Sequence, residues 1–228
     1  AIWYPQSAFC NPHAFVMAAA ELARLGGAEI VEGAPVSRLI VCEGKAVGVE
    51  TEDGRTIEGD AVVLAAGSWT PALARQAGVR LLMQPAKGYH RDVAMEGAEL
   101  RTACIFGEAN MVCTPMDGFV RLAGTLEFSG MNGAVRPRRL EMLSEQAGRY
   151  LASRVVGPAR SEWMGLRPCT PDGLPAIGWA PNVGGVFIAT GHAMLGLSQG
   201  PATGEIVAEC VVEGGTDIDL APMRPDRF

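Results

Sequence analysis

Two apolar runs that end in glycine constrain the fold of this chain more than any other feature. They are AVVLAAG at residues 61–67 and GGVFIATG at residues 184–191. Continuous apolar runs of this length are typical of buried strands in a parallel sheet, where ligands bind outside the carboxyl ends of the strands. We therefore expect both runs to be buried strands that lead into a ligand crevice.

The segments between these runs have a different character, because they alternate like antiparallel strands. They are KGYHRDVAM, ACIFGEANMVCTPM and GFVRLAGTLEFSG, followed by a charged helix at residues 136–155. The fold class we predict is α/β (α+β), a partial parallel sheet with helices plus an antiparallel-sheet domain. The expected division is residues 1–84, then 85–165 as the antiparallel domain, then 166–228 returning to the first region.

Local patterns add detail to residues 1–84. Asn11 is a candidate cap, Pro12 a first helical residue and Gly26-Gly27 a stop, with apolar spacing typical of a half-buried helix. Three strand-like pieces follow as a small meander, with Asp53-Gly54 as the hairpin turn between the last two.

Composition excludes several classes of protein. The net charge of -6 and the lack of a dense Lys/Arg stripe argue against a nucleic-acid partner. The six cysteines contain no C-x-x-C pair, which favours reduced structural thiols in a cytoplasmic protein and gives no metal site. No apolar stretch is long enough to span a bilayer, and the first residues lack the pattern of a signal peptide.

The glycine-rich stretch TGHAMLGLSQGPATG at residues 190–204 is the first candidate site. Its glycines allow close backbone approach, and the following helix, with Ser198 near its cap and Pro201 in its first turn, offers free N–H groups to an anion. A strand-to-helix turn without a ligand explains the pattern equally well. A phosphate P-loop is excluded, because the G-K-[ST] ending is missing.

Arg167 is the second candidate, in WMGLRPCTPDGLPAIG at residues 163–178. Its planar guanidinium matches a carboxylate in two hydrogen bonds, and its neighbours are stiff and apolar. The alternative is an internal ion pair with Asp172. His192 could polarise a ligand or bond the backbone, and Tyr89 and His90 could line a pocket or be ordinary strand residues.

The order and spacing of these motifs resemble the C-terminal portion of the D-amino-acid dehydrogenase and glycine oxidase group of FAD-dependent oxidoreductases. The resemblance implies oxidative deamination of an amino acid by transfer of a hydride from the substrate Cα to the flavin, followed by hydrolysis of the imino acid. It covers nearly the whole chain, through WMGLRPCTPDGLPAIG, GVFIATGHAMLGLSQGPATG, RPDRF, NPHAFVMAAAELARLGGAEI, GAPVSRLIV, VVLAAGSW and QPAKGY.

By this resemblance, Arg167 holds the substrate carboxylate, with Tyr89 and His90 in the same substrate pocket, and Arg167 and His192 are the catalytic candidates. Val36 is expected on the adenine side of FAD and Ala66 and Gly67 near the cofactor. The stretch along the flavin comprises Gly191, His192, Ala193, Met194, Leu195, Gly196, Leu197 and Ser198.

One element of that group is absent, since the sequence contains no G-x-G-x-x-G turn for the FAD pyrophosphate. We therefore expect the chain to be the C-terminal portion of a longer protein and its exposed apolar surface to be covered by a partner chain or by self-association. Two alternatives stay open: a non-catalytic fragment or accessory subunit without flavin, and a binding protein for a small carboxylate. The expected location is the cytoplasm, with peripheral binding at the inner membrane as an option.

Overall fold

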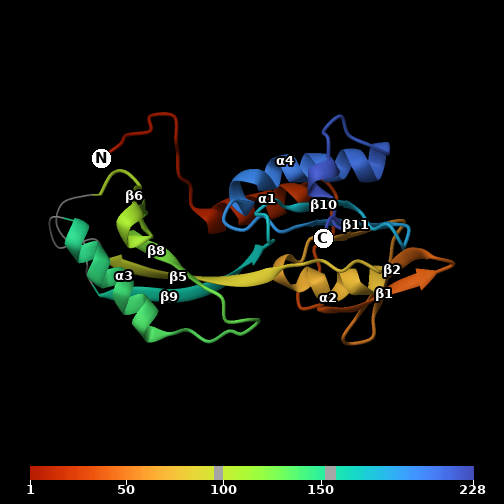
Figure 1. Cartoon of the computed structure of the whole chain (residues 1–228), viewed down its shortest axis with the longest axis horizontal. Coiled ribbons are helices and arrows are strands. Elements are labelled where there is room, and N and C mark those ends of the chain that lie inside the picture. Colours follow the sequence, from red (N-terminus) through yellow and green to blue (C-terminus); the bar gives the residue numbers. More distant parts are fainter. Residues whose placement is uncertain (95–99, 152–157) are drawn as a thin grey trace. The chain divides into compact units, whose positions relative to one another are not determined.

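The computed structural model describes residues 1–94, 100–151 and 158–228, and these divide into two compact units (Figure 1). The expected division kept residues 1–84 together, whereas the contacts group Ala1–Ile30 with the antiparallel segments. Unit 1 comprises Ala1–Ile30, Lys87–Glu127 and Asn132–Gly165, and unit 2 comprises Val31–Ala86, Phe128–Met131 and Leu166–Phe228.

Unit 1 contains most of a five-stranded sheet in the order β6-β7-β8-β5-β9. The pairs β6–β7, β7–β8 and β8–β5 are antiparallel, as the alternation of the sequence predicts. The strands are β5 (Gln84–Ala94), β6 (Cys104–Phe106), β7 (Met111–Met116), β8 (Phe119–Glu127) and β9 (Ala159–Cys169).

One face of this sheet is covered by the helix α3 (Pro137–Tyr150). Leu140, Leu143 and Ala147 of α3 are buried in one cluster with side chains of the strands. Because successive side chains of a strand point to opposite faces, this packing commits alternate residues of β5, β7 and β8 to the core. The predicted helix extends to residue 155, and its last part lies outside the described residues, as does residue 95 of the first predicted strand.

The strand β9 was not expected from its sequence. Its residues include Gly165 and Pro168, which the sequence analysis treated as a stiff glycine- and proline-rich run. The sheet order explains how a strand forms there, because β9 lies at the edge and an edge strand tolerates a proline without an N–H donor.

The first helix, α1 (Pro12–Leu25), has the ends that the sequence predicts. The Asn11 side chain accepts hydrogen bonds from the N–H groups of His13 and Ala14 at 3.1 and 3.2 Å, and Gly26 follows the last turn. The prediction of a half-buried helix is wrong, because α1 buries none of its residues against the described chain. Leu22 and Leu25 are 69% and 76% exposed, which leaves an apolar stripe without a covering surface.

Unit 2 begins with the antiparallel meander β1 (Val36–Cys42), β2 (Lys45–Thr51) and β3 (Thr56–Glu58). The predicted hairpin turn is confirmed: Gly54 has a φ of +83° and its N–H donates to the carbonyl of Thr51. The third predicted strand is two strands, β3 and β4 (Val62–Leu64), separated by Gly59, Asp60 and Ala61.

A second, mixed sheet of unit 2 has the order β10-β11-β4. The strands β4 and β11 (Val186–Thr190) are parallel, with Val186 opposite Val62 and Ile188 opposite Leu64. The prediction of a buried strand is confirmed for β11, all of whose residues are buried, whereas β4 buries Leu64 alone. The strand β10 (Ala176–Trp179), which the sequence analysis did not predict, pairs antiparallel with β11.

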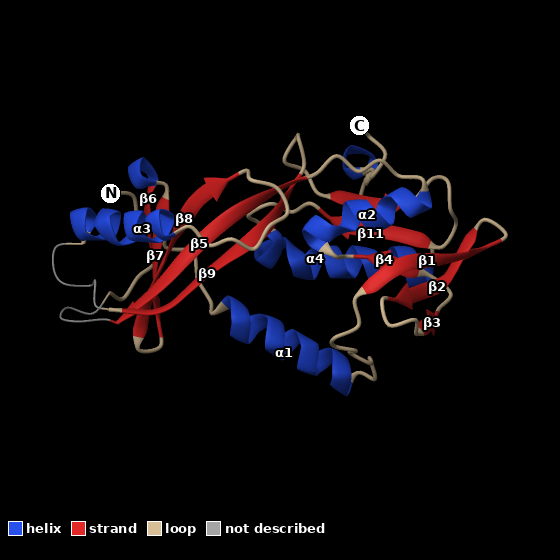
Figure 2. Cartoon of the chain, turned by 90° about the horizontal axis from the view of Figure 1, so that it is seen from below, coloured by secondary structure: helices blue, strands red, loops and turns tan. Residues whose placement is uncertain are grey.

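Helical segments follow β4 and β11 in the chain and lie beside this sheet (Figure 2). After β4 come the 3₁₀ turn η1 (Gly67–Trp69), the short helix α2 (Thr70–Ala74) and a second 3₁₀ turn, η2 (Arg75–Ala77). After β11 come the helix α4 (Gly196–Ala208), a π-helical end, η4 (Glu209–Glu213), and the 3₁₀ turn η5 (Ala221–Met223). Ile206 and Cys210 pack on Ile177 and Phe187 of the sheet.

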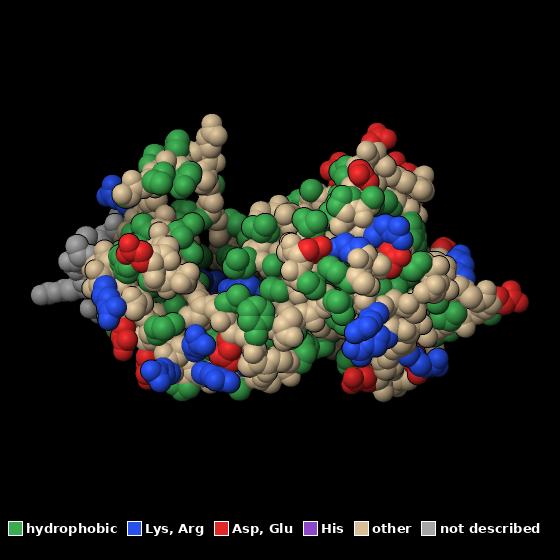
Figure 3. All heavy atoms as spheres, viewed as in Figure 1, with side chains coloured by type: hydrophobic (Ala, Val, Ile, Leu, Met, Phe, Trp, Pro, Cys, Tyr) green, Lys and Arg blue, Asp and Glu red, His purple; other side chains and the backbone are tan. Residues whose placement is uncertain are grey.

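Apolar side chains also reach the surface in many places (Figure 3). In unit 2 they include Val63 on β4, which is 39% exposed, and Val212 after α4, which is 82% exposed. Among the described residues, no helix has the length and apolar character that crossing a membrane requires.

Candidate functional site

The carboxyl ends of the parallel strands β4 and β11 come together in unit 2. Parallel neighbours end at the same edge of a sheet, and each of these strands runs into a glycine. The Thr190 hydroxyl at the end of β11 donates a hydrogen bond to the carbonyl of Gly67 at 3.2 Å. Ala66 and Gly67 are thereby placed beside the start of the loop that begins at Gly191.

Gly191 is needed for its conformation and for its lack of a side chain. Its φ is +87°, and a Cβ atom there would lie 2.9 Å from Cγ2 of Thr170 and 3.3 Å from the backbone nitrogen of Ala176. Such contacts are closer than real Cβ atoms tolerate, so the loop packs directly against the chain that follows β9.

Two further contacts fix this loop on the end of β9. The N–H of Ala193, whose own φ is +47°, donates to the carbonyl of Pro168 at 3.0 Å. His192 forms an isolated antiparallel bridge with Cys169. A left-handed conformation at a residue other than glycine is strained and persists only where the surroundings impose it.

Arg167 lies on β9, two residues before Cys169, so both side chains leave the strand on the same side. Burial lowers the pKa of the Arg167 guanidinium from its ordinary value, yet an arginine keeps its charge at any physiological pH. Burial raises the pKa of the Cys169 thiol, and the positive charge of Arg167 opposes that rise. A half-buried cation therefore lies at the strand end that holds the loop of His192.

The imidazole of His192 has one hydrogen-bond partner, the Thr203 hydroxyl of α4, at 2.9 Å from Nε2. Burial lowers the pKa of His192, so the ring is neutral at pH 7. This contact ties the loop to the helix, and the side chain in this position orients the loop.

The N-terminus of α4 offers unpaired backbone donors. Its N-cap residue is Leu195, and no side chain of the described chain caps the first turn. Ser198 lies near the cap as predicted, in the first turn, where its hydroxyl donates to the carbonyl of Leu195 at 3.3 Å. Pro201 lies further inside the helix than predicted. The four glycines and Pro201 misled the sequence analysis about where the helix begins.

Met194 and Leu195 present apolar side chains beside this helix end. They are 71% and 54% exposed, and Leu197 is 37% exposed. An exposed apolar loop next to free N–H groups is suited to contact with a large, partly apolar ligand.

Two buried hydroxyl groups that sequence reasoning missed follow Gly67. Ser68 and Thr70 are 7% and 0% exposed, and their hydroxyl oxygens have no hydrogen-bond partner in the described part of the chain. Buried polar groups normally have hydrogen-bond partners, so we expect a polar ligand or another polypeptide to form hydrogen bonds with these two hydroxyl groups. The residues SWT after the first apolar run were the available sequence signal.

The carboxylate of Asp172, which the sequence offered as a partner of Arg167, is held by Arg227. Arg227 donates to both oxygens at 2.8 and 3.0 Å and to the carbonyl of Leu174 at 2.8 Å. These bonds lower the pKa of Asp172 to about 2. The C-terminal segment thereby fixes the turn that follows β9, a role for Arg227 that the sequence analysis did not identify.

Tyr89 and His90 belong to unit 1, where they point to opposite faces of β5. Tyr89 is buried on the α3 side, and its hydroxyl donates to Glu127 at 3.1 Å. The His90 ring stacks on Trp163 with 5.3 Å between centroids. Burial, followed by the charge of Arg121, lowers the pKa of His90. The two residues expected in one pocket are therefore on different sides of the sheet.

Val36 lies at the start of β1, opposite Thr51, with a side chain that is 36% exposed. It is in the meander and takes no part in the bonds that join the ends of β4, β9 and β11. Among the described residues, no group of three His, Cys, Asp or Glu side chains is arranged to hold a metal ion.

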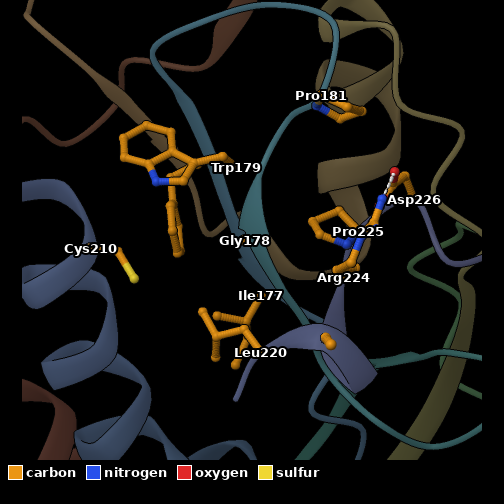
Figure 4. A pocket seen from close by; sticks show the side chains of 11 residues that line it. Ile177, Gly178, Trp179, Pro181, Cys210, Leu220, Arg224, Pro225 and Asp226 are labelled. Atoms are coloured by element: carbon orange, nitrogen blue, oxygen red, sulfur yellow. Dashed lines mark hydrogen bonds and ion pairs between the residues drawn. The ribbon is translucent and has the colours of Figure 1, made fainter. Parts of the chain in front are cut away.

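A cavity of about 380 Å³ in unit 2 lies among other residues (Figure 4). Trp179 and Phe187 both line it and meet edge-on at 5.1 Å between ring centroids, and Arg224 pairs with Asp226 among the other lining residues (Figure 4). None of the residues that the sequence predicted for the site lines this cavity.

Comparisons with known proteins agree on one family. The family model described as FAD dependent oxidoreductase matches residues 1–210. A D-amino acid dehydrogenase of Cereibacter sphaeroides is 33% identical over 216 residues, which are 94% of this chain and 49% of that protein. The chain spans about half the length of most of the curated relatives it matches.

One relative is matched over almost its whole length. An uncharacterised oxidoreductase of Halorhodospira halophila is 34% identical over 219 residues, which cover 94% of this chain and 99% of that protein. Among solved structures, glycine oxidase from Geobacillus kaustophilus superposes with a TM-score of 0.81 at 29% identity, over 93% of this chain and 57% of that chain. Iminodiacetate oxidase from Chelativorans sp. BNC1 gives a TM-score of 0.81 at 25% identity, over 93% and 58%.

Proposed function

The chain belongs to the FAD-dependent oxidoreductases, and from this premise we propose that it is part of an enzyme that oxidatively deaminates an amino acid. The observation that carries the proposal is Arg167, a half-buried cation at the strand end that fixes the loop before α4. Relatives named D-amino acid dehydrogenase and a structural neighbour named glycine oxidase support a D-amino acid or a glycine-like amine as the substrate class.

The residues at the ends of β4 and β11 fit a flavin cofactor. Gly67 and Gly191 let the backbone approach a ligand, the first turn of α4 supplies N–H donors, and the hydroxyls of Ser68 and Thr70 await partners. We assign Ala66, Gly67 and the stretch from Gly191 to Ser198 to this contact, with Val36 on the adenine side. Bound FAD would supply the hydride acceptor.

The chain's own residues bind and orient the substrate. Arg167 receives the carboxylate in two charge-assisted hydrogen bonds, which fixes the position of the substrate Cα. His192 stays neutral and holds the loop on Thr203, so that the helix end keeps its direction. No side-chain base is required if the substrate amine binds deprotonated. His90 and Tyr89 stay candidates for substrate contacts, and exposure favours His90.

We infer that another polypeptide, or a second copy of this chain, completes the flavin site. The sequence has no G-x-G-x-x-G turn, and β4 has a strand on only one side among the described residues. Open strand edges and the apolar stripe of α1 are surfaces that proteins usually cover. Static light scattering on a gel-filtration column tests this: a monomer at every concentration would contradict self-association.

The second candidate is a non-catalytic subunit that does not bind FAD alone, and the missing glycine motif favours it. An absorption spectrum of the purified chain, mixed with excess FAD and then desalted, separates the two. A retained flavin band supports the enzyme and leads to assays of amino-acid turnover. A colourless protein, even at high concentration, assigns the chain to the second candidate.

Arg167 is tested by carboxylate binding. Titration calorimetry with benzoate should give saturable binding to the flavin-loaded protein, and Arg167→Ala should weaken it by about a hundredfold, because a buried charge pair loses one partner. Arg160→Ala is the matched control, since this arginine lies on the same strand and bonds the carbonyl of Gly118. Equal benzoate affinity in wild type and Arg167→Ala would overturn the assignment.

We propose that the protein is located in the cytoplasm, with peripheral binding at the inner membrane as the alternative. Fractionation of cells with a salt wash of the membranes tests this placement. Protein that stays with the membrane after the wash would contradict it.

A further inference from the structure

We propose that Cys104 and Cys113 form an intramolecular disulfide when the protein meets a hydroperoxide. The two residues lie directly opposite each other in the antiparallel pair β6–β7. Directly opposed residues project to the same face with Cβ atoms about 4.5–5.5 Å apart, close to the separation that a disulfide needs. The strand register therefore makes the two thiols direct cross-strand neighbours on one face of the sheet.

The other cysteines lack such an arrangement. Cys10 and Cys42 are exposed, Cys210 is buried in η4 against the sheet of unit 2, and Cys169 is opposite His192. Among the strand pairs of the described chain, the β6–β7 pair brings one cysteine opposite another. The proposal therefore concerns a defined pair of residues.

The two thiols differ in access, which sets the order of the steps. Cys113 is 0% exposed and packs in the core beneath α3, while Cys104 is half-buried at the edge of the sheet. Burial, with a further contribution from the negative charge of Cys104, raises the pKa of Cys113 to about 12. Cys104 is the thiol that a peroxide meets first.

The reaction balances with a hydroperoxide as the oxidant. The Cys104 thiolate attacks one peroxide oxygen, so an S–O bond forms, the O–O bond breaks, and the leaving oxygen takes a proton to become an alcohol or water. The Cys113 sulfur then attacks the sulfenic sulfur, so the S–S bond forms and the S–O bond breaks. The thiol proton of Cys113 leaves with the hydroxide as water. Two thiols lose two electrons in total, and the peroxide gains them.

The disulfide would link the short edge strand β6 covalently to β7. The strand β6 has three residues and pairs on one side with β7. Its Phe106 stacks on Tyr150 of α3 at 4.7 Å between centroids, and the Tyr150 hydroxyl donates to Glu108 at 3.0 Å. A disulfide adds a covalent tie at the other end of the strand and closes the short loop between β6 and β7, which restricts the unfolded chain.

The test is a peroxide titration of the purified protein followed by alkylation and peptide mapping by mass spectrometry. We expect the intact mass to fall by two hydrogen atoms, the alkylatable thiols to fall from the six free cysteines to four, and a linked peptide pair to contain Cys104 and Cys113. A reductant should restore all six.

Variants show whether the link is specific. Cys104→Ser should abolish the loss of two hydrogens, and Cys210→Ser, which removes a buried cysteine outside the pair, should leave the link intact. The wild-type map carries the proposal even if a variant fails to fold. Oxygen addition to Cys104 without a link, no reaction at Cys104, or a disulfide between other cysteines would each overturn it.

Discussion

The two sheets of this protein are completed to different degrees. In unit 1, the strands β6, β7 and β8 follow one another in the chain and pair as neighbours, and β5 pairs with β8. Leu140 and Leu143 of α3 cover one face of this sheet. In unit 2, β4 and β11 come from distant parts of the chain, and α4 buries only Ile206. The sheet of unit 1 forms one core cluster with α3, whereas the sheet of unit 2 contributes to two core clusters and holds polar and strained residues at its strand ends. We expect unit 1 to depend on apolar packing and the candidate site of unit 2 on backbone fit.

The largest expected effect is in the core of unit 1. Leu143→Ala removes a leucine that is 1% exposed between α3 and the sheet, and we expect a loss of about 2–5 kcal/mol in the free energy of unfolding. Urea unfolding gives the loss, and amide hydrogen exchange locates it. Glu145→Ala on the exposed side of α3 is the control, with an expected change below about 0.5 kcal/mol.

The contrast between the two sheets would be contradicted if amide hydrogen exchange in Leu143→Ala accelerates as much in β4 and β11 as in β7 and β8. Such a result would mean that the two sheets share one stability, although their cores are separate clusters. A loss of protection against amide exchange that occurs first in β7 and β8 would support separate stabilities for the two sheets.

The next effect tests backbone fit at the site. Gly191→Ala places a Cβ atom 2.9 Å from Thr170 at a φ of +87°. We expect a loss of about 2–3 kcal/mol in unfolding free energy, measured by thermal and urea unfolding. Gly214→Ala is the matched control, because its φ is +89° and a Cβ there meets no atom within 4 Å. That variant has the conformational strain alone, about 1 kcal/mol.

The difference between these two variants measures how closely the loop packs on the chain after β9. Equal losses would show that the contact at Thr170 relaxes without cost. The loop would then be an ordinary turn, and the rigid placement of His192 and Ala193 would lose its main support.

The sequence contained more of the fold than of the site. The continuous apolar pattern of the two runs predicted two strands of a parallel sheet, but it did not predict that these strands are neighbours. Asn11 and Gly54 predicted a cap and a turn through local hydrogen bonds. The strand β9 was missed because its edge position, which tolerates Pro168, depends on the whole sheet. The partner of Asp172 was missed because Arg227 is near in space and distant in sequence, and no local pattern records such a contact. Burial of α1 was wrongly predicted because periodicity shows an apolar face without showing what covers it.

A smaller effect concerns the ion pair that holds the turn after β9. Asp172→Asn should cost about 0.5–1 kcal/mol at pH 7, the range for a partly exposed pair with two bonds. The pKa of Asp172 is lowered on folding, so its contribution is complete above the unfolded value near 4 and disappears as the pH falls toward about 2. The stability difference between wild type and Asp172→Asn should therefore vanish between these pH values, as urea unfolding at several pH values can show.

Asp226→Asn is the control for this pair, because its partner Arg224 is 62% exposed and the loss should be smaller. If the difference between Asp172→Asn and wild type stays constant down to pH 2, the ion pair does not stabilise the turn. The fit of the strand ends would then rest on the glycine contacts alone.

The smallest effect on stability is expected at α1, and its readout is association. Leu22 is 69% exposed and contributes little to the fold of the described chain, so Leu22→Glu should change the unfolding free energy by less than about 0.5 kcal/mol. If a second copy of the chain covers the apolar stripe of α1, the same substitution should shift the protein toward the monomer in light scattering. Glu21→Gln, the neighbouring exposed position, should leave the molecular mass unchanged. A large loss of stability in Leu22→Glu would mean that α1 packs against its own chain. The apolar stripe of α1 would then not be a surface for a partner.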